Sequence, residues 1–158
     1  MKRIKGFNFK NKKTIIRVDF NVPLNKDQKV TDNSRLIGAL KTIKTVIKNR
    51  GIVILISHLG RPKGKNKEEL SLKHVLPFLK KELSCPVSFF NDCVGIETKE
   101  FINQQKPGSV TLLENLRFYP EEELGDVNFA KELASLADIY INDAFGTAHR
   151  AHASTSII

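Results

Sequence analysis

Cationic and polar side chains recur in four short segments of the 158-residue sequence, each directly after an apolar run. Guanidinium groups bind phosphate and carboxylate through paired hydrogen bonds and stay charged at every working pH. Arginines that converge from separate segments would therefore hold a small phosphorylated acid, and Asp19 and Asn21 would suit its hydroxyl groups. The side chains concerned are Asp19 and Asn21, then His58 and Arg61, then Glu114, Asn115 and Arg117, and finally Asp143, His149 and Arg150.

Each of these residues taken alone has a structural explanation. A single exposed arginine is most often part of a surface ion pair, and Asp19 or Asn21 could be a turn residue that bonds to its own backbone. The joint placement of the four segments is what favours a binding site, because the carboxyl ends of parallel strands are where α/β sheets bind ligands.

Other apparent motifs do not predict a site. Residues 60–65 (GRPKGK) are one residue short of a phosphate-binding P-loop, and Asn66 stands where that motif needs Ser or Thr. No G-x-G-x-x-G occurs. His149 and His152 form an H-x-x-H without a carboxylate at a supporting spacing, so we predict no metal site. Cys93 is interpreted as a buried small residue.

The elements that must position these side chains alternate between strand and helix. Apolar, β-branched runs predict strands at residues 14–20, 52–57, 86–90, 110–114 and 139–143. Helical patterns cover residues 34–49, 71–83, 95–104 and 128–136, and Pro77 should kink the second of these or delay its start. The alternation predicts an α/β fold, a Rossmann-like three-layer domain with a mostly parallel sheet and helices on both faces.

Composition limits the class of protein. Apolar residues make up 41% of the chain, enough for a packed core. The net charge of +9 is compatible with nucleic acid, an anionic membrane or a small anionic substrate as partner. The lysines are scattered, which is typical of a solvated surface. The N-terminus lacks the apolar region of a signal peptide, no run is long enough to span a membrane, and the two cysteines form no C-x-x-C, so a reduced, cytoplasmic chain is expected.

Four segments, in order, resemble the N-terminal domain of the phosphoglycerate kinase family. They are residues 17–23 (RVDFNVP), 57–62 (SHLGRP), 113–118 (LENLRF) and 142–152 (NDAFGTAHRAH). The resemblance implies reversible phosphoryl transfer between 1,3-bisphosphoglycerate and ADP, giving 3-phosphoglycerate and ATP in glycolysis. In that family the N-terminal domain holds the phosphoglycerate and the C-terminal domain holds the Mg-nucleotide.

The resemblance also implies roles for individual residues. Asp19 and Asn21 would contact the glycerate hydroxyl and carboxylate region, and a basic patch would surround the phosphate. Arg35 would be catalytic, because it would steady the transferring phosphoryl group. Arg17 lies inside a predicted strand and is expected to be structural. The full set of implied substrate-binding residues is Asp19, Phe20, Asn21, Arg35, His58, Leu59, Gly60, Arg61, Arg117 and Arg150.

The same resemblance predicts what this chain lacks. Residues 1–158 would be the phosphoglycerate-binding domain, and the sequence has no counterpart of the nucleotide-binding domain, the interdomain helix or the returning C-terminal segment. We therefore expect a monomeric piece of a longer enzyme that binds no metal or cofactor, since Mg-ATP or Mg-ADP would occupy the missing domain, and that is inactive alone. A naturally short, inactive relative is an alternative reading. A basic module for nucleic acid is another, although the arginines do not line one helix.

Overall fold

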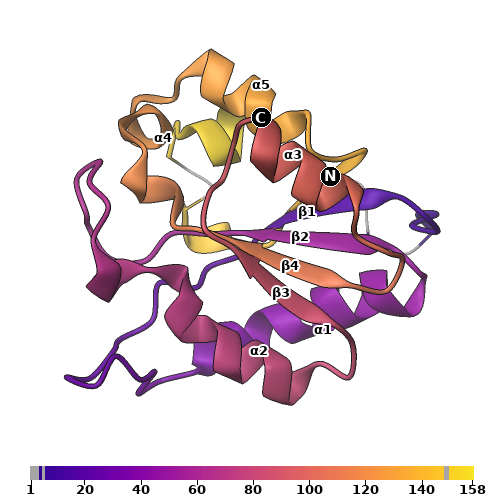
Figure 1. Cartoon of the computed structure of the whole chain (residues 1–158), viewed down its shortest axis with the longest axis horizontal. Coiled ribbons are helices and arrows are strands. Elements are labelled where there is room, and N and C mark those ends of the chain that lie inside the picture. The colour runs from indigo at the N-terminus through magenta and orange to yellow at the C-terminus, as the bar shows by residue number, and fades with distance from the viewer. Residues whose placement is uncertain (1–3, 5, 148–149) are drawn as a thin grey trace.

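A computed structural model describes residue 4, residues 6–147 and residues 150–158. Within these residues the chain forms a five-stranded parallel sheet in the order β3-β4-β2-β1-β5 (Figure 1). All five residues of β2 are buried, because it lies at the centre of the sheet and helices cover both of its faces. The strands are β1 (Lys13–Arg17), β2 (Ile52–Ile56), β3 (Val87–Phe90), β4 (Val110–Leu113) and β5 (Ile139–Asn142).

Helices pack on both faces of the sheet, which gives three layers (Figure 1). Helices α1 (Ser34–Lys48) and α2 (Leu76–Glu82) cover one face, and α3 (Ile96–Asn103), α4 (Pro120–Leu124) and α5 (Val127–Ala134) lie on the other. A hydrophobic core lies on each face of the sheet, and neighbouring residues of β2 point into different cores. Leu55 packs with the first group of helices and Ile54 with the second. The predicted α/β class and the parallel sheet are confirmed.

Pro77 has the predicted effect on the second helix. The segment begins as a 3₁₀ turn at Leu72–Val75, and the α-helix proper starts at Leu76 with the proline in its first turn. Proline is tolerated there because its missing N–H would have had no partner within the helix.

The first strand is shorter than predicted. It ends at Arg17, not at residue 20, because the backbone then leaves the ladder. The Phe20 N–H donates to the side chain of Ser57, and the Asp19 carboxylate accepts the Asn21 N–H in a local turn. Helix α4 and a π-helical turn at Ala153–Ile157 were not anticipated at all. In the described part of the chain, no helix combines the length and apolar character that crossing a membrane requires.

A candidate anion-binding site at the carboxyl edge of the sheet

A pocket of about 290 Å³ lies where the carboxyl ends of the central strands meet. Eight of the ten residues assigned by the family resemblance line it, and Gly146 is the additional one. The loops after β1, β2, β4 and β5 and the start of α1 all contribute side chains, as expected for one edge of a parallel sheet. The lining residues are Asp19, Asn21, Arg35, His58, Gly60, Arg61, Arg117, Gly146 and Arg150.

The structure places the other two assigned residues elsewhere. The side chains of Phe20 and Leu59 are 0% and 2% exposed and belong to the hydrophobic core on the α1 side of the sheet. Their neighbours in sequence turn toward the pocket, so a residue-by-residue transfer of the motif includes positions whose side chains only pack. Any contact of Phe20 or Leu59 with a ligand would have to come from the backbone, and the assignment of these two residues to the site stays a prediction.

Arg117 is the most firmly held guanidinium group of the pocket. Its side chain is only 4% exposed, Nη1 donates to the Gly60 carbonyl at 3.1 Å, and Nε lies 3.7 Å from Glu123 Oε1. Burial lowers the pKa of Arg117, and the Glu123 carboxylate opposes that shift. An arginine fixed in this way needs little ordering when it binds an anion.

Asn115, which is fully buried, ties together the loops that carry the pocket. Its side-chain amide donates to the carbonyls of Leu59 and Leu70 at 2.7 and 2.9 Å, and its oxygen accepts the Arg117 N–H at 3.0 Å. The preceding Glu114 accepts hydrogen bonds from the residue 71–72 segment. The loops after β2 and β4 are thus held as one unit.

The opposite side of the pocket is acidic and amidic. Arg35 Nη1 lies 2.9 Å from Asp19 Oδ2 and 3.0 Å from Oδ1. Asn21 Oδ1 accepts the Gly60 N–H at 2.9 Å. Gly60 has φ of +61°, and a Cβ there would lie 2.7 Å from Leu70 Cδ2, so both conformation and space favour glycine. This arrangement lets the backbone of the loop approach the pocket closely.

His58 lines the pocket as a neutral ring and not as a positive charge. Burial is the main reason that its pKa is lowered to about 2, and the nearby charges of Arg17, Arg117, Arg150 and His152 lower it further. The imidazole is therefore neutral at physiological pH. The expected basic patch owes its charge to the arginines, and this distinction depends on neighbours that sequence spacing does not reveal.

Two contributors to the site were missed by sequence reasoning. Gly146 lies in the fourth motif, and a Cβ at this position would be 3.8 Å from Asp19 Oδ2, so a position facing the pocket was foreseeable. Arg17 was expected to be structural, and the one sequence feature that could have indicated a role near the site is its position as an arginine at the end of an apolar strand. His149, which belonged to the predicted cluster and to the H-x-x-H, lies outside the described residues.

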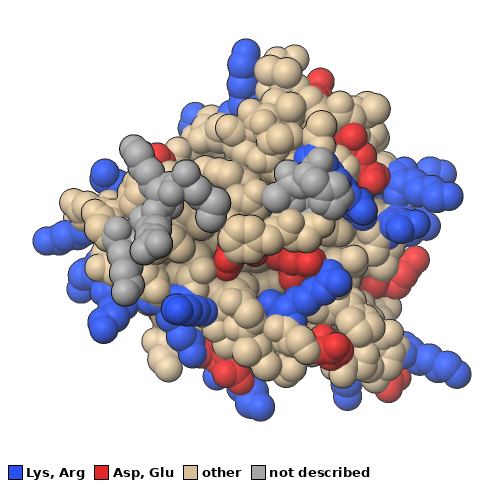
Figure 2. Space-filling model, turned by 180° about the vertical axis from the view of Figure 1, so that it is seen from behind, with Lys and Arg blue, Asp and Glu red and all other residues tan. Residues whose placement is uncertain are grey.

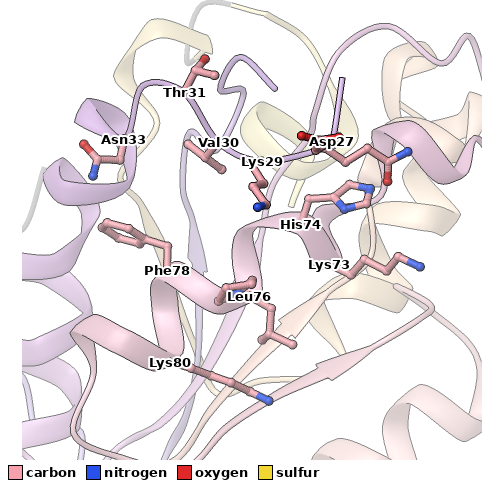
Figure 3. Close-up of a pocket in the computed structure, with 12 residues that line it drawn as sticks. Asp27, Lys29, Val30, Thr31, Asn33, Lys73, His74, Leu76, Phe78 and Lys80 are labelled. Atoms are coloured by element: carbon pink, nitrogen blue, oxygen red, sulfur yellow. The ribbon is translucent and has the colours of Figure 1, made fainter. Parts of the chain in front are cut away.

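A larger and more open hollow of about 870 Å³ lies between residues 27–33 and the start of α2 (Figure 3). Lys73 pairs with Glu68 and the His74 ring contacts the Glu68 carbonyl, and no arginine in the described part of the chain lines this hollow, although Lys29 and Lys80 do. Apolar side chains such as Val30 and Phe78 make up much of the wall. The smaller, arginine-lined pocket is therefore the better candidate for an anion-binding site. Among the described residues, no group of three or more His, Cys, Asp or Glu side chains could hold a metal ion.

Comparison with known proteins points to one family. A family model described as phosphoglycerate kinase matches residues 4–158. The phosphoglycerate kinase of Moorella thermoacetica is 56% identical over 152 residues, which are 96% of this chain and 38% of the relative. The enzyme of Chlorobium limicola is 51% identical over 154 residues, 98% of this chain and 39% of the relative. The segment that the family model matches contains all the residues that line the pocket.

The fold gives the same answer. The solved structure of phosphoglycerate kinase from Coxiella burnetii superimposes with a TM-score of 0.86 at 39% identity and covers 98% of this chain and 38% of that one. The phosphoglycerate kinase structure from Pyrococcus horikoshii also gives 0.86, at 34% identity. The chain spans 39% of the length of the Chlorobium relative. With its sequence, its sheet topology and its arginine-lined strand ends in agreement, the chain belongs to the phosphoglycerate kinase family.

Proposed function

We propose that the carboxyl-edge pocket binds 3-phosphoglycerate and 1,3-bisphosphoglycerate, and that this chain supplies the phosphoglycerate site of a phosphoglycerate kinase. The observation that carries the proposal is the convergence of Arg35, Arg61, Arg117 and Arg150 from separate segments on one pocket of about 290 Å³. Four guanidinium groups, which stay charged at every working pH, exceed what one phosphate requires and match a ligand with an anionic group at each end.

The chain's own residues divide the work by their mobility. Arg117 is buried and braced, which suits it to orient the non-reacting phosphate. The side chain of Arg35 is 53% exposed, so it can follow a group that moves during the reaction. We propose that Arg35 stabilises the charge of the transferring phosphoryl group and is the catalytic residue. Asp19 and Asn21 would bind the glycerate hydroxyl and carboxylate region.

We assign Mg-ATP and Mg-ADP to the part of the relatives' length that this chain does not span. A Mg-nucleotide supplies the phosphoryl donor or acceptor and screens charge during transfer. Residues 1–158 would then bind and orient the phosphoglycerate as an N-terminal domain. We expect the chain alone, as a monomer, to form no ATP from 1,3-bisphosphoglycerate and ADP.

The distribution of charge gives little support to nucleic-acid binding. In Figure 2 the Lys and Arg side chains are spread around the outline of the molecule, and acidic side chains stand between them. Binding to a nucleic-acid backbone normally uses a continuous basic surface. The net charge of +9 therefore reflects a scattered surface, and the specific signal lies in the pocket.

Titration of the chain with 3-phosphoglycerate tests the proposal. Arginine Nε–H signals are followed by NMR, and we expect saturable shifts of Arg117 and Arg150 in the millimolar range. Arg117→Ala should abolish the shift of Arg150, whereas Arg50→Ala should leave the shifts of both arginines unchanged, since Arg50 is exposed and precedes β2 at the other end of that strand. A folded sample that shows no shift would refute the proposal. Binding to single-stranded RNA with a steep salt dependence, unaffected by 3-phosphoglycerate, would favour the nucleic-acid alternative.

A further inference from the structure

Arg17, the last residue of β1, lies beneath the pocket and is 1% exposed. Each edge of its guanidinium group donates to a different partner. Nε donates to Ser154 Oγ at 2.9 Å, Nη1 donates to the Val18 carbonyl, and Nη2 lies 3.1 Å from His58 Nδ1. Arg17 does not line the pocket, but His58 does. A buried cation therefore contacts the imidazole ring that lines the pocket, and His58 is the pocket residue whose side chain it touches within the described part of the chain.

This contact determines which ring nitrogen carries the proton. An arginine side chain offers only donors, so His58 Nδ1 must act as the acceptor. A neutral imidazole with an accepting Nδ1 carries its hydrogen on Nε2. Since Nδ1 faces Arg17, the Nε2 edge is the one that remains for the pocket.

Arg17 is itself held by a buried acid through Ser154. The Ser154 hydroxyl donates to Glu122 Oε1, and its N–H donates to Oε2 at 2.9 Å. The Tyr140 hydroxyl donates to the Ser154 carbonyl at 2.8 Å, which fixes the turn. Glu122 and Ser154 are both 0% exposed, and the Glu122 carboxylate opposes the effect of burial on the pKa of Arg17. The positive charge of Arg17 is thus compensated by the Glu122 carboxylate, which does not line the pocket.

We propose that Arg17 is a positioning residue that, held by Ser154 and Glu122, fixes His58 in its Nε2–H tautomer so that a neutral donor faces the bound anion. The other tautomer would present a lone pair to the anion, and the two would repel each other. The identity of the anion rests on the proposed function, whereas the tautomer does not. Arg17 acts through His58 and does not touch the ligand.

The tautomer can be measured directly in the free chain. With ¹⁵N-labelled histidine, long-range ¹H–¹⁵N correlations distinguish a protonated ring nitrogen from an unprotonated one. We expect His58 to show an unprotonated Nδ1 and a protonated Nε2 at every pH from 8 to 5. A proton on Nδ1, or a doubly protonated ring at pH 7, would overturn the proposal.

Arg17→Met tests the cause, because methionine fills much of the same space and cannot donate. We expect it to yield a mixture of both His58 tautomers and to weaken 3-phosphoglycerate binding about tenfold, the order of effect of one hydrogen bond to a charged group. Arg50→Met is the matched control and should leave both readouts unchanged. If Arg17→Met alone does not fold, Arg17→Met with Glu122→Gln removes both buried charges together and carries the same expectation.

The outcomes separate this proposal from the proposed function. If His58 remains purely in the Nε2–H tautomer in a variant without Arg17, the positioning role is refuted, whatever binds in the pocket. A wild-type chain with the expected tautomer and no response to 3-phosphoglycerate overturns the substrate assignment and leaves the role of Arg17 in place. A merely structural role for Arg17 would change the stability of the chain without changing the tautomer.

Discussion

The carboxylate of Asp19 holds the guanidinium group of Arg35, with both carboxylate oxygens within 3.0 Å of Nη1. The arginine proposed to serve the transferring group is therefore paired within the chain before any ligand binds. A ligand anion must compete with Asp19 for Arg35. The pair sets the electrostatic balance of the pocket more than it sets stability, because its two side chains are 53% and 23% exposed.

Asp19→Asn should raise the affinity of the pocket for a simple anion. Removing one negative charge several ångströms from the anion is expected to strengthen sulfate binding about threefold. The affinity for 3-phosphoglycerate should rise less or fall, since the contact to its hydroxyl weakens. Isothermal titration of both ligands measures this, with the exposed Asp27→Asn as control. The free energy of unfolding should change by less than about 1 kcal/mol in Asp19→Asn. Weaker sulfate binding by this variant would contradict the interpretation.

Replacement of arginine by lysine should affect the braced and the exposed arginines differently. Lysine keeps the charge but loses the planar fork that donates to the Gly60 carbonyl and that would, under the proposed function, also donate to the anion. Arg117→Lys is therefore expected to weaken 3-phosphoglycerate binding about tenfold. Arg61→Lys, at an exposed position, should weaken 3-phosphoglycerate binding less. Equal effects at the two positions, judged from the same titration with Arg50→Lys as reference, would argue against the preorganised role of Arg117.

The stability of the chain should fall as the pH is lowered below the ordinary histidine pKa. His58 has its pKa lowered to about 2 by burial and by surrounding positive charges, so the unfolded chain gains a proton near pH 6.5 that the folded chain does not. Protonation then favours the unfolded state. His58 alone should reduce the free energy of unfolding by about 2 kcal/mol between pH 7.5 and 5.

Urea unfolding at both pH values measures this loss, and His58→Gln should remove most of it. His74→Gln is a useful control, because that ring is bonded to a backbone carbonyl far from the arginines. If His58→Gln retained the full pH dependence, the neutral state of His58 in the fold would be wrong.

Asn115→Ala should destabilise the chain strongly, although asparagine carries no charge. The change removes three hydrogen bonds and leaves the carbonyls of Leu59 and Leu70 without that donor. We expect a loss of about 2 to 4 kcal/mol in the free energy of unfolding. Asn128→Ala, on the exposed surface of α5, should stay within about 0.5 kcal/mol of the wild type. A small effect of Asn115→Ala would mean that the two loops are held by other contacts.

Sequence reasoning located the edge of the sheet that carries the site, because parallel strands bring their carboxyl ends together whatever the details of packing. Asp19, His58 and Arg117 could be predicted for that reason. The direction in which each side chain points could not, since β1 ends at Arg17 and the alternation of the strand does not continue to Phe20. The binding roles of the pocket residues stay predictions.

The protonation state of a residue is harder to predict from the sequence than its position. The pKa of His58 is lowered first by burial and then by Arg17, Arg150 and other neighbours that come from distant parts of the chain. The support of Arg17 by Ser154 and Glu122 likewise joins residues without any common motif. Short-range patterns carry no information about such contacts, because they arise from the packing of loops onto one another.

The hydrogen bond between Arg17 and Ser154 has a consequence for the order of events during synthesis. It joins residues 137 positions apart, and β1 gains its second neighbour only when residues 139–142 pair with it. A ribosome-bound chain that has emerged only through β4 would already contain Arg17 and His58, but it would lack Arg117 of the pocket and the Ser154 and Glu122 side chains that hold Arg17. The pocket should therefore acquire its ligand-binding shape at the end of translation of this segment, in the same step that closes the sheet.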